Sequence, residues 1–167
     1  MRVYHFTNAE FGLQDIRRRR LKIARISDLN DPFEFLQVAS RDPKARGRYQ
    51  YAKRGLNEYM GLLCFSETWR NPVQWSHYAD RHRGICLGFD VLKSAGMQKV
   101  RYIEQRIPPN LRAMQAEGPE AEAHMLDLLT LKFQHWAYER EHRLFVHLQD
   151  RDAETGLYFL SSGRQVR

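Results

Sequence analysis

Alternation of apolar and polar residues at the start of the chain predicts a strand, a helix and a second strand. In residues 2–7 (RVYHFT) the period of two places Val3, His5 and Thr7 on one face, with the remaining side chains on the other. Asn8 is a favourable N-cap for the run AEFGLQDIRRRR that follows it. The segment LKIARIS alternates again, so it predicts the second strand.

Continuous apolar runs in the middle of the chain predict strands buried on both faces. GLLCFSE and RGICLGFDV are runs of this kind. Between them, NPVQWSHYAD predicts a short helix, because Asn71 can cap its N-terminus and Pro72 suits the first helical position. Further upstream, DLNDPFEF is rich in turn-forming residues, and DPKARGRYQYAKRGLNEYM is expected to be helical in its second half.

The last part of the chain predicts one long helix and several strands. The helix is expected over residues 110–135, with a break around Gly118 and Pro119. QKVRYIEQR before it predicts a more exposed strand, and YEREHRLFVHL and GLYFLSS after it predict two more. Helices and strands are interspersed without strict alternation, and no repeat or linker divides them. The pattern therefore predicts an α+β fold in a single domain over residues 1–167.

Composition agrees with one folded domain and narrows the expected location. The chain has 167 residues, of which 43% are hydrophobic, enough for a sizeable core. No apolar run is long enough to span a bilayer, and MRVYHFT lacks the apolar centre of a signal peptide. We therefore expect a cytoplasmic protein with no membrane partner. The net charge of +7 is typical of a solvated surface and is also compatible with a phosphate-bearing ligand.

Several familiar sites are disfavoured. The sequence has neither the G-x-G-x-x-G fingerprint of dinucleotide-binding folds nor a P-loop. Cys64, His77, His82 and Cys86 are zinc-ligand types, but their spacing does not match paired zinc ligands, and both cysteines lie in apolar runs. A nucleophile such as Ser66 or Cys64 with His77 as base lacks the turn motif that would position it. We expect no metal and no disulfide.

Acidic residues in YEREHR are the leading candidates for chemistry. If residues 138–147 form one strand, Glu139, Glu141 and Arg143 share a face. Two carboxylates on one face raise each other's pKa unless a cation intervenes, and Arg143 is placed to be that cation. The alternative is an edge strand whose charges protect it from aggregation. The residues alone leave both interpretations open.

Polar groups elsewhere are candidates for ligand contacts. His5 and Thr7 share a strand face and offer donors and acceptors suited to ribose hydroxyls or a carboxamide. Tyr78 belongs to a stripe at helical spacing, which is typical of core packing. Alternatively, its ring is a stacking platform for a planar heterocycle. The stripe comprises Trp75, Tyr78, Ala79 and His82.

Motifs along the chain resemble, in order, those of a bacterial family of unknown function, the domain family numbered twenty-nine seventy-one. They are YHFT, SDLNDPFEF, CFSET, WSHYADRHRGICLGFD and WAYEREHR, and they cover the chain nearly end to end. The resemblance implies no settled biochemistry, although some members occur near phage-defence genes. For Asn30, Asp31 and Glu34 in LNDPFE, lining of a ligand cleft and ordinary turn capping both stay open.

The order of these motifs is also similar to that of the H-Y-E class of ADP-ribosyltransferases. This resemblance implies a split β-sheet of that type with flanking helices, whose cleft grips NAD as a substrate. By motif position, His5 would bind the adenosine-side ribose, Thr7 the nicotinamide carboxamide, and Tyr78 would stack on the nicotinamide ring. Glu141 would be the catalytic carboxylate, with Glu139 two residues earlier as in the E-x-E arrangement of a sister class. The implied catalytic residues are Glu141, Tyr78 and His5.

The same resemblance carries further expectations about the site and the function. Ser66, the small polar residue that ends a central strand, is expected among the NAD-binding residues together with Glu139. Phe6 stands where the class has glycine and would have to point away from the ligand. The implied function is an NAD-dependent ADP-ribosyltransferase that modifies a protein or nucleic acid, as a toxin with an antitoxin partner or as a phage-defence effector. The alternatives are an NAD glycohydrolase and a non-catalytic nucleotide- or nucleic-acid-binding module on the same fold.

Overall fold

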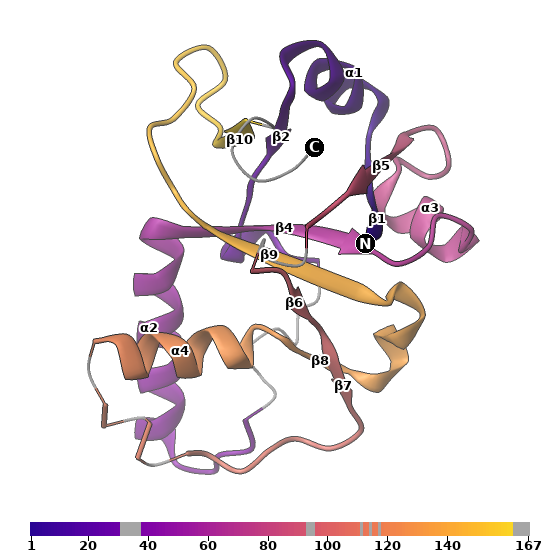
Figure 1. The fold of residues 1–167 in the computed structure, drawn as a ribbon. Coiled ribbons are helices and arrows are strands. Elements are labelled where there is room, and N and C mark those ends of the chain that lie inside the picture. The colour runs from indigo at the N-terminus through magenta and orange to yellow at the C-terminus, as the bar shows by residue number, and fades with distance from the viewer. Residues whose placement is uncertain (31–37, 93–95, 111, 114, 117, 162–167) are drawn as a thin grey trace.

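A central sheet with helices at its sides and ends forms the molecule, which confirms the predicted α+β arrangement (Figure 1). The structure is a computed structural model that describes residues 1–30, 38–92, 96–110, 112–113, 115–116 and 118–161. In this part of the chain, no helix is long and apolar enough to cross a membrane.

The central sheet is antiparallel and has the strand order β5-β1-β4-β9-β6, with β3 also pairing with β4. The strands are β1 (Arg2–Thr7), β3 (Ala24–Arg25), β4 (Met60–Ser66), β5 (Ile85–Asp90), β6 (Gln98–Lys99) and β9 (Glu141–His147). β4 has hydrogen-bonded neighbours on both of its edges, and its side chains are almost all buried. The prediction that GLLCFSE forms a strand buried on both faces is therefore confirmed.

The sheet opens between β1 and β4. Within the described residues these strands pair at a single position, Tyr4 opposite Ser66, whereas β1 pairs with β5 along its whole length. Figure 1 shows β1 and β5 rising toward α1 while β4 and β9 run across the molecule. Next to the pairing position, the His5 ring bridges the opening, because its Nδ1 lies 2.9 Å from the carbonyl oxygen of Cys64.

Two hydrophobic cores lie against opposite faces of β4 because its side chains alternate. Leu62 packs in a core shared with α2 and α4, whereas Leu63 and Phe65 pack in a core beneath β1. Both leucines are 0–1% exposed, so neither face of β4 is open to water at these two positions. The first core comprises Ile26, Tyr49, Leu56, Met60, Leu62, Met125, Leu128, Leu129 and Leu131. The second comprises Val3, Leu21, Leu63, Phe65, Val91 and Leu144.

Helices begin where the sequence provides caps. The helices are α1 (Ala9–Arg18), α2 (Pro43–Tyr59), α3 (Pro72–Tyr78) and α4 (Pro119–Leu128). The Asn8 side chain accepts a hydrogen bond of 2.7 Å from the Phe11 N–H, and Asn71 caps α3 in the same way. Both predicted caps are confirmed. α2 starts earlier than the sequence indicates, because Asp42 caps it at the Lys44 N–H and its buried positions recur at helical spacing.

Shorter elements complete the fold. β2 (Arg20–Lys22) pairs with β10 (Phe159–Ser161), and β7 (Arg101–Ile103) pairs in parallel with β8 (Leu131–Phe133). Short 3-10 helices form η1 (Ile26–Asp28) and η3 (Gln134–Glu139). η3 leads directly into β9, and this junction positions the acidic residues of the site.

The helix predicted over residues 110–135 is confirmed only in part: α4 begins at Pro119, at the predicted break, but the predicted extension to residue 135 is wrong. α4 ends at Leu128, and the chain continues as β8 and η3. Thr130 ends the helix, because both its N–H and its hydroxyl bond the Asp127 carbonyl, at 3.0 and 2.7 Å. The following residues then pair with β7 instead of extending the helix. An apolar run as short as LLTLKF is compatible with a helix and with a strand, so its periodicity could not distinguish between them.

Three strand predictions are corrected in detail. LKIARIS is divided into β2 and β3, because the Ile23 N–H bonds the Tyr158 carbonyl at 2.9 Å and the chain then enters η1. QKVRYIEQR is divided into β6 and β7, which lie in different sheets. β5 is a strand, as predicted, but it lies at the edge of the sheet with half-buried or exposed residues, so its predicted burial is wrong. Most of DLNDPFEF lies outside the described residues.

Candidate functional site

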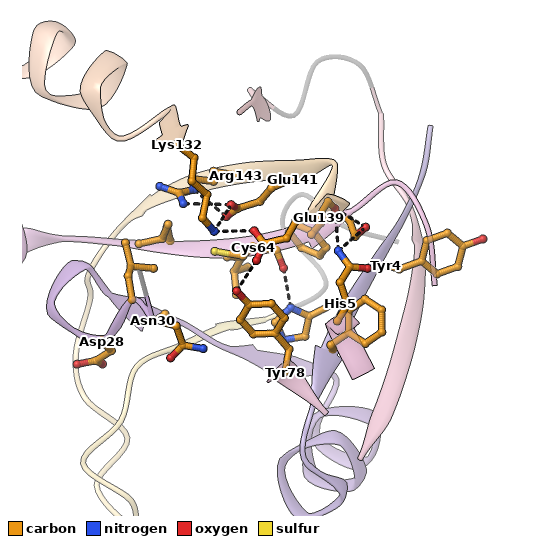
Figure 2. A pocket seen from close by; sticks show the side chains of 18 of the residues that line it. Tyr4, His5, Asp28, Asn30, Cys64, Tyr78, Lys132, Glu139, Glu141 and Arg143 are labelled. Carbon is orange, nitrogen blue, oxygen red and sulfur yellow. Dashed lines mark hydrogen bonds and ion pairs between the residues drawn. The ribbon is translucent and has the colours of Figure 1, made fainter. Parts of the chain in front are cut away.

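A cleft of about 190 Å³ lies where β1 and β4 diverge (Figure 2). β4 forms its floor through residues 62–66, and His5 and Phe6 of β1 line one side. Lys132, Glu139 and Glu141 line another side. One water occupies roughly 30 Å³ of liquid volume, so the space can hold a group the size of an aromatic ring.

Most of the residues singled out from the sequence meet at this cleft. They are His5, Ser66, Tyr78, Glu139 and Glu141. Thr7 does not line it. Thr7 lies in a more open neighbouring cleft of about 640 Å³, which shares His5, Phe6 and Tyr78 with the first. Asn30 lines the first cleft, whereas Asp31 and Glu34 lie outside the described residues.

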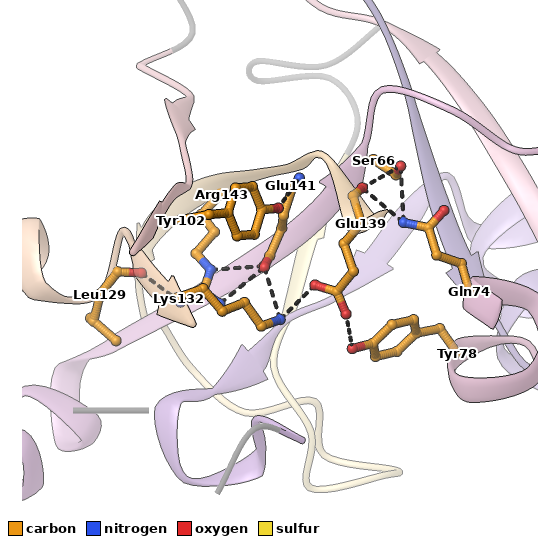
Figure 3. A network of polar contacts seen from close by, with 9 residues as sticks. All are labelled: Ser66, Gln74, Tyr78, Tyr102, Leu129, Lys132, Glu139, Glu141 and Arg143. Atoms are coloured by element: carbon orange, nitrogen blue, oxygen red, sulfur yellow. Dashed lines mark hydrogen bonds and ion pairs between the residues drawn. The ribbon is translucent and has the colours of Figure 1, made fainter. Parts of the chain in front are cut away.

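Buried ion pairs connect the two glutamates (Figure 3). The ammonium group of Lys132 lies 2.6 Å from Oε2 of Glu139 and 3.1 Å from Oε2 of Glu141. The guanidinium of Arg143 binds both oxygens of Glu141, at 2.7 and 3.1 Å. Oε1 of Glu139 accepts a hydrogen bond of 2.5 Å from the hydroxyl of Tyr78. Arg143 is thus the cation beside Glu141, as predicted, and Lys132 is a second one that joins the pair.

The two carboxylates differ in their electrostatics. Burial favours the neutral form of Glu141, but the charges of Arg143 and Lys132 outweigh it and lower its pKa to about 2. Burial also raises the pKa of Glu139, and there the opposing charge of Lys132 does not cancel the effects of burial and of the nearby Glu141. Glu141 is therefore held as an anion, whereas Glu139 takes up a proton more readily than an ordinary glutamate does.

A left-handed residue places Glu139 where a strand would not. Arg140 has φ 46°, so η3 ends there and β9 begins at Glu141. The prediction that Glu139 and Glu141 lie on one continuous strand is therefore wrong. The two carboxylates still converge, because the turn directs Glu139 toward the same ammonium group that Glu141 binds.

Backbone groups of Glu139 are held by buried polar side chains (Figure 3). Its carbonyl oxygen accepts hydrogen bonds from the hydroxyl of Ser66 at 2.6 Å and from the amide of Gln74 at 2.8 Å. Ser66 is 4% exposed, and its hydroxyl also accepts from the Gln74 amide and the Thr68 N–H. The hydroxyl of Ser66 therefore positions Glu139 within the wall of the cleft.

His5 presents an acceptor to the cleft. A carbonyl oxygen can only accept, so the hydrogen bond to Cys64 places the proton of the neutral ring on Nδ1 and leaves Nε2 without one. Burial lowers the pKa of His5 and outweighs the carbonyl contact, which favours this neutral form. Nε2 can therefore accept a hydrogen bond from a ligand hydroxyl or amide.

Tyr78 is the last residue of α3, and its neighbours explain its position. Trp75 packs edge-on against Phe6 and donates from Nε1 to the Trp69 carbonyl, so it is a packing residue as the sequence indicates. Burial, together with the neighbouring Glu139, raises the pKa of Tyr78, so its hydroxyl stays protonated and donates to Glu139. His82 lies beyond the helix in an exposed turn, so the predicted stripe does not extend to it.

Lys132 and Gln74 are the site residues that sequence reasoning missed. Lys132 is 4% exposed, and a lone lysine in the apolar run LLTLKF was the signal that could have revealed it, since lysine is rarely buried without a partner. Gln74 is 2% exposed and carried no comparable signal. Cys64 and Cys86 are both free thiols, and the described residues include no cluster of His, Cys, Asp and Glu that could hold a metal ion.

Comparison with known proteins connects the site to a family. No curated protein and no solved structure matches the chain. A family model does match residues 74–144, a stretch that runs from Gln74 in α3 to Leu144 in β9 and includes Tyr78, Lys132 and both glutamates of the site. The matched family, the one that the motifs resemble, is described as "Protein of unknown function (DUF2971)".

Proposed function

We propose that the protein is an NAD-dependent enzyme of the ADP-ribosyltransferase type, which transfers ADP-ribose to a macromolecule. The observation that carries the proposal is the convergence of His5, Tyr78 and the pair Glu139–Glu141 on one cleft, although they lie far apart in sequence. From the resemblance to the H-Y-E class, we expect a dinucleotide to bind in the split between β1 and β4. The adjoining open cleft offers room for the rest of a dinucleotide, and Lys132 and Lys22 provide cations within reach of the two spaces.

Glu139 is the carboxylate to which we assign the chemistry. When the bond between nicotinamide and ribose breaks, nicotinamide leaves with the bonding electron pair and positive charge develops on the ribose. An anionic carboxylate beside the ribose stabilises that charge and can accept the proton that the attacking acceptor loses. Glu139 is suited to both roles: the Lys132 ammonium beside it favours its anionic form, and its raised pKa favours uptake of the proton. It lines the cleft next to Tyr78, to which it is hydrogen-bonded. Glu141, bound by Arg143 and Lys132, would hold Lys132 in place.

His5 and Tyr78 would orient the substrate. The unprotonated Nε2 of His5 is suited to accept a hydrogen bond from a ribose hydroxyl. The ring of Tyr78 is suited to contact the planar nicotinamide, and its hydroxyl holds Glu139. The resemblance assigned the nicotinamide carboxamide to Thr7, whose place in the neighbouring cleft would instead bring it close to the other end of the ligand.

A non-catalytic nucleotide-binding module is the second candidate. It is favoured by one observation: each carboxylate oxygen of Glu139 and Glu141 has a cation or a hydroxyl partner in the described structure. A closed network of this kind is also expected in a structural core. Activity measurements with glutamate variants separate the two candidates.

The test is incubation of the protein with radiolabelled NAD and cell extract, followed by measurement of labelled macromolecules and of released nicotinamide. We expect transfer of the label, and we expect Glu139→Gln to lower the rate of nicotinamide release by about 10²- to 10⁴-fold. Release of nicotinamide without labelled macromolecules would indicate the glycohydrolase. NAD binding without release would indicate the binding module, and absence of binding would contradict both.

Matched variants keep this test interpretable. Glu104→Gln removes a carboxylate from an exposed position and should leave the rate unchanged. Glu141→Gln removes the partner of two buried cations, so we expect it to lower stability by about 3–5 kcal/mol as well as activity. If Glu139→Gln keeps its folded structure and full activity, Glu139 is not the reacting carboxylate.

A further inference from the structure

Helix α2 has one face in the core and an opposite face covered by cations. Ala45, Tyr49 and Leu56 are buried and recur at helical spacing, so they fix which side of the helix packs against the sheet. Figure 1 shows α2 as a long helix at one side of the molecule, crossed by α4. Among the described residues, those of α2 line neither part of the cleft. The outer face of α2 is therefore a surface separate from the candidate active site.

Tyr51 stands on this outer face and is 81% exposed. Its helical neighbours at four residues on either side are Gly47 and Gly55, and at three residues on either side Arg48 and Arg54. At this spacing the glycines have no side chain that could cover the ring, and the arginines are its nearest charged neighbours along the helix. An exposed aromatic ring bounded in this way is an open stacking platform.

The two glycines have no explanation within the described structure. Glycine in the interior of a helix is unfavourable relative to alanine, because it loses more conformational freedom on folding. Apart from its chain neighbours and the backbone of the helix itself, a Cβ atom added at Gly47 or at Gly55 would have no described atom within 4 Å, so packing does not demand glycine at either position. Close approach of an external chain to the helix would demand it.

The charge of the same face is positive, and within the described part of the chain it has few acidic neighbours. Lys44, Arg48 and Arg54 are exposed, and none of them makes an ion pair among the residues that the structure describes. The helix itself contains one acidic residue, Glu58, whose carboxylate pairs with Arg25 at 3.2 Å. A partner for this surface therefore carries negative charge at several points.

We propose that the outer face of α2 binds single-stranded nucleic acid. The arginines and the lysine would contact successive phosphates, the ring of Tyr51 would stack on a base, and the glycines would let the nucleotide backbone approach the helix. Base stacking on an exposed aromatic ring and a basic groove or stripe along the backbone are the two elements of such binding. An anionic membrane fits less well, because insertion needs large apolar side chains and the exposed apolar residues of α2 are Tyr51 and Tyr59.

The experiment measures binding of a fluorescein-labelled oligothymidylate and oligouridylate to the full chain by fluorescence anisotropy at several salt concentrations. We expect Tyr51→Ala to weaken binding by roughly 5- to 150-fold. We expect Arg48→Gln with Arg54→Gln to weaken it further and to lower the slope of log affinity against log salt by about 0.7 for each phosphate that is no longer neutralised. Vesicles of phosphatidylcholine with phosphatidylserine serve as the membrane probe.

The glycine variants distinguish a binding surface from a face that only contacts water, because only in a binding surface should they weaken oligonucleotide binding. Gly47→Ala and Gly55→Ala should each raise the melting temperature by about 2–4 °C, because alanine favours the helix, and should weaken oligonucleotide binding. The control is Arg17→Gln with Arg106→Gln, which removes the same charge from exposed positions outside α2.

Three results would overturn the proposal: no oligonucleotide binding, equal weakening of binding in the control and the α2 variants, or stronger binding to the vesicles than to the oligonucleotides. The α2 variants should leave nicotinamide release unchanged when no nucleic acid is present, so failure of this proposal is distinguishable from failure of the proposed enzymatic function.

Discussion

Lys132 is the side chain on which the charge balance of the cleft depends. It is 4% exposed and binds one oxygen from each glutamate, so two buried anions share it. Burial disfavours its charged form, but the charges of Glu141 and Glu139 outweigh burial and raise its pKa. Lys132 therefore keeps its charge, and its loss would leave Glu139 without an ionic partner in the described structure.

Replacement of Lys132 by methionine should destabilise the protein by about 3–5 kcal/mol at neutral pH, because it leaves a buried carboxylate unpaired. Lys132 lowers the pKa of Glu139, so without it that pKa rises further and the folded state takes up a proton more readily. The destabilisation should therefore be smaller at acid pH and larger at alkaline pH. Urea denaturation across the pH range measures this difference. Lys99→Met, which removes an exposed ion pair with Glu67, should cost at most about 1 kcal/mol at any pH.

Asp15, which lies outside the cleft, should make the stability of the fold depend on pH in a second way. Its side chain is on the core side of α1, and burial raises its pKa from 3.8 to about 6 despite the charge of Arg20. Because the pKa of Asp15 is higher in the folded state than in the unfolded state, the folded state binds this proton more tightly. The stability that the proton contributes is complete below about pH 4 and is lost as the pH rises through about 6. Asp15→Asn should remove this loss and make the protein more stable than the wild type by about 1–2 kcal/mol above that range. Thermal denaturation at several pH values measures it, and parallel curves for the two proteins would contradict the prediction.

Among the elements, the turn between α3 and β5 determines where Tyr78 lies. After α3, the residues Asp80, Arg81 and His82 all have positive φ, between 44° and 69°. The turn closes at Gly84, whose N–H bonds the Ala79 carbonyl at 2.7 Å. Conformations of this kind are unfavourable for residues with a side chain, so surrounding contacts must hold them. Those contacts include the close approach of Gly84 to β1.

Gly84→Ala should disturb this turn. The new Cβ atom would overlap the Thr7 carbonyl oxygen and lie 2.8 Å from the Cα atom of Ala79, and backbone atoms cannot move aside easily. We expect a loss of about 1–3 kcal/mol in stability. Gly55→Ala, where nothing described lies within 4 Å, should change the melting temperature in the opposite direction. Equal melting temperatures for the two variants would show that the close approach of Gly84 to Thr7 and Ala79 does not affect stability.

For the molecule as a whole, β4 contributes side chains to both hydrophobic cores. Leu62 belongs to the core beside α2 and α4, and Leu63 to the core beside β1. β4 is also the floor of the cleft, so both cores support the same strand that the site depends on. We therefore expect the protein to lose both cores in one cooperative transition.

Leu62→Ala and Leu63→Ala should each lower the free energy of unfolding by about 2–5 kcal/mol, although they leave cavities on opposite faces of β4. Each should speed hydrogen exchange of β4 and β9 amides throughout, because the pairing between these strands is common to both cores. Chemical denaturation and hydrogen exchange provide the two measurements. Leu92→Ala, at a residue 73% exposed, should stay within about 0.5 kcal/mol of the wild type. A separate transition for each core would contradict the prediction.

Local signals in the sequence determined the elements whose causes lie within a few residues. Asn8 and Asn71 cap helices through their own neighbours, and residues 2–7 form a strand as their alternation predicts. Residue type, together with the resemblance to the H-Y-E class, brought His5, Tyr78, Glu139 and Glu141 forward as candidates, and these residues meet at one cleft. Residue type and spacing were sufficient for the two helix caps because capping involves no distant contact.

Tertiary structure alone decided the features that depend on distant partners. Lys132 became part of the site because β8 pairs with β7 instead of continuing α4, and Glu139 entered it through the left-handed turn at Arg140. The contrast between the two carboxylates also has this origin, since Glu141 lies beside Arg143 and Lys132 whereas Glu139 shares only Lys132. A charge in a buried site is set by which groups surround it in space, and a single sequence does not state those distances.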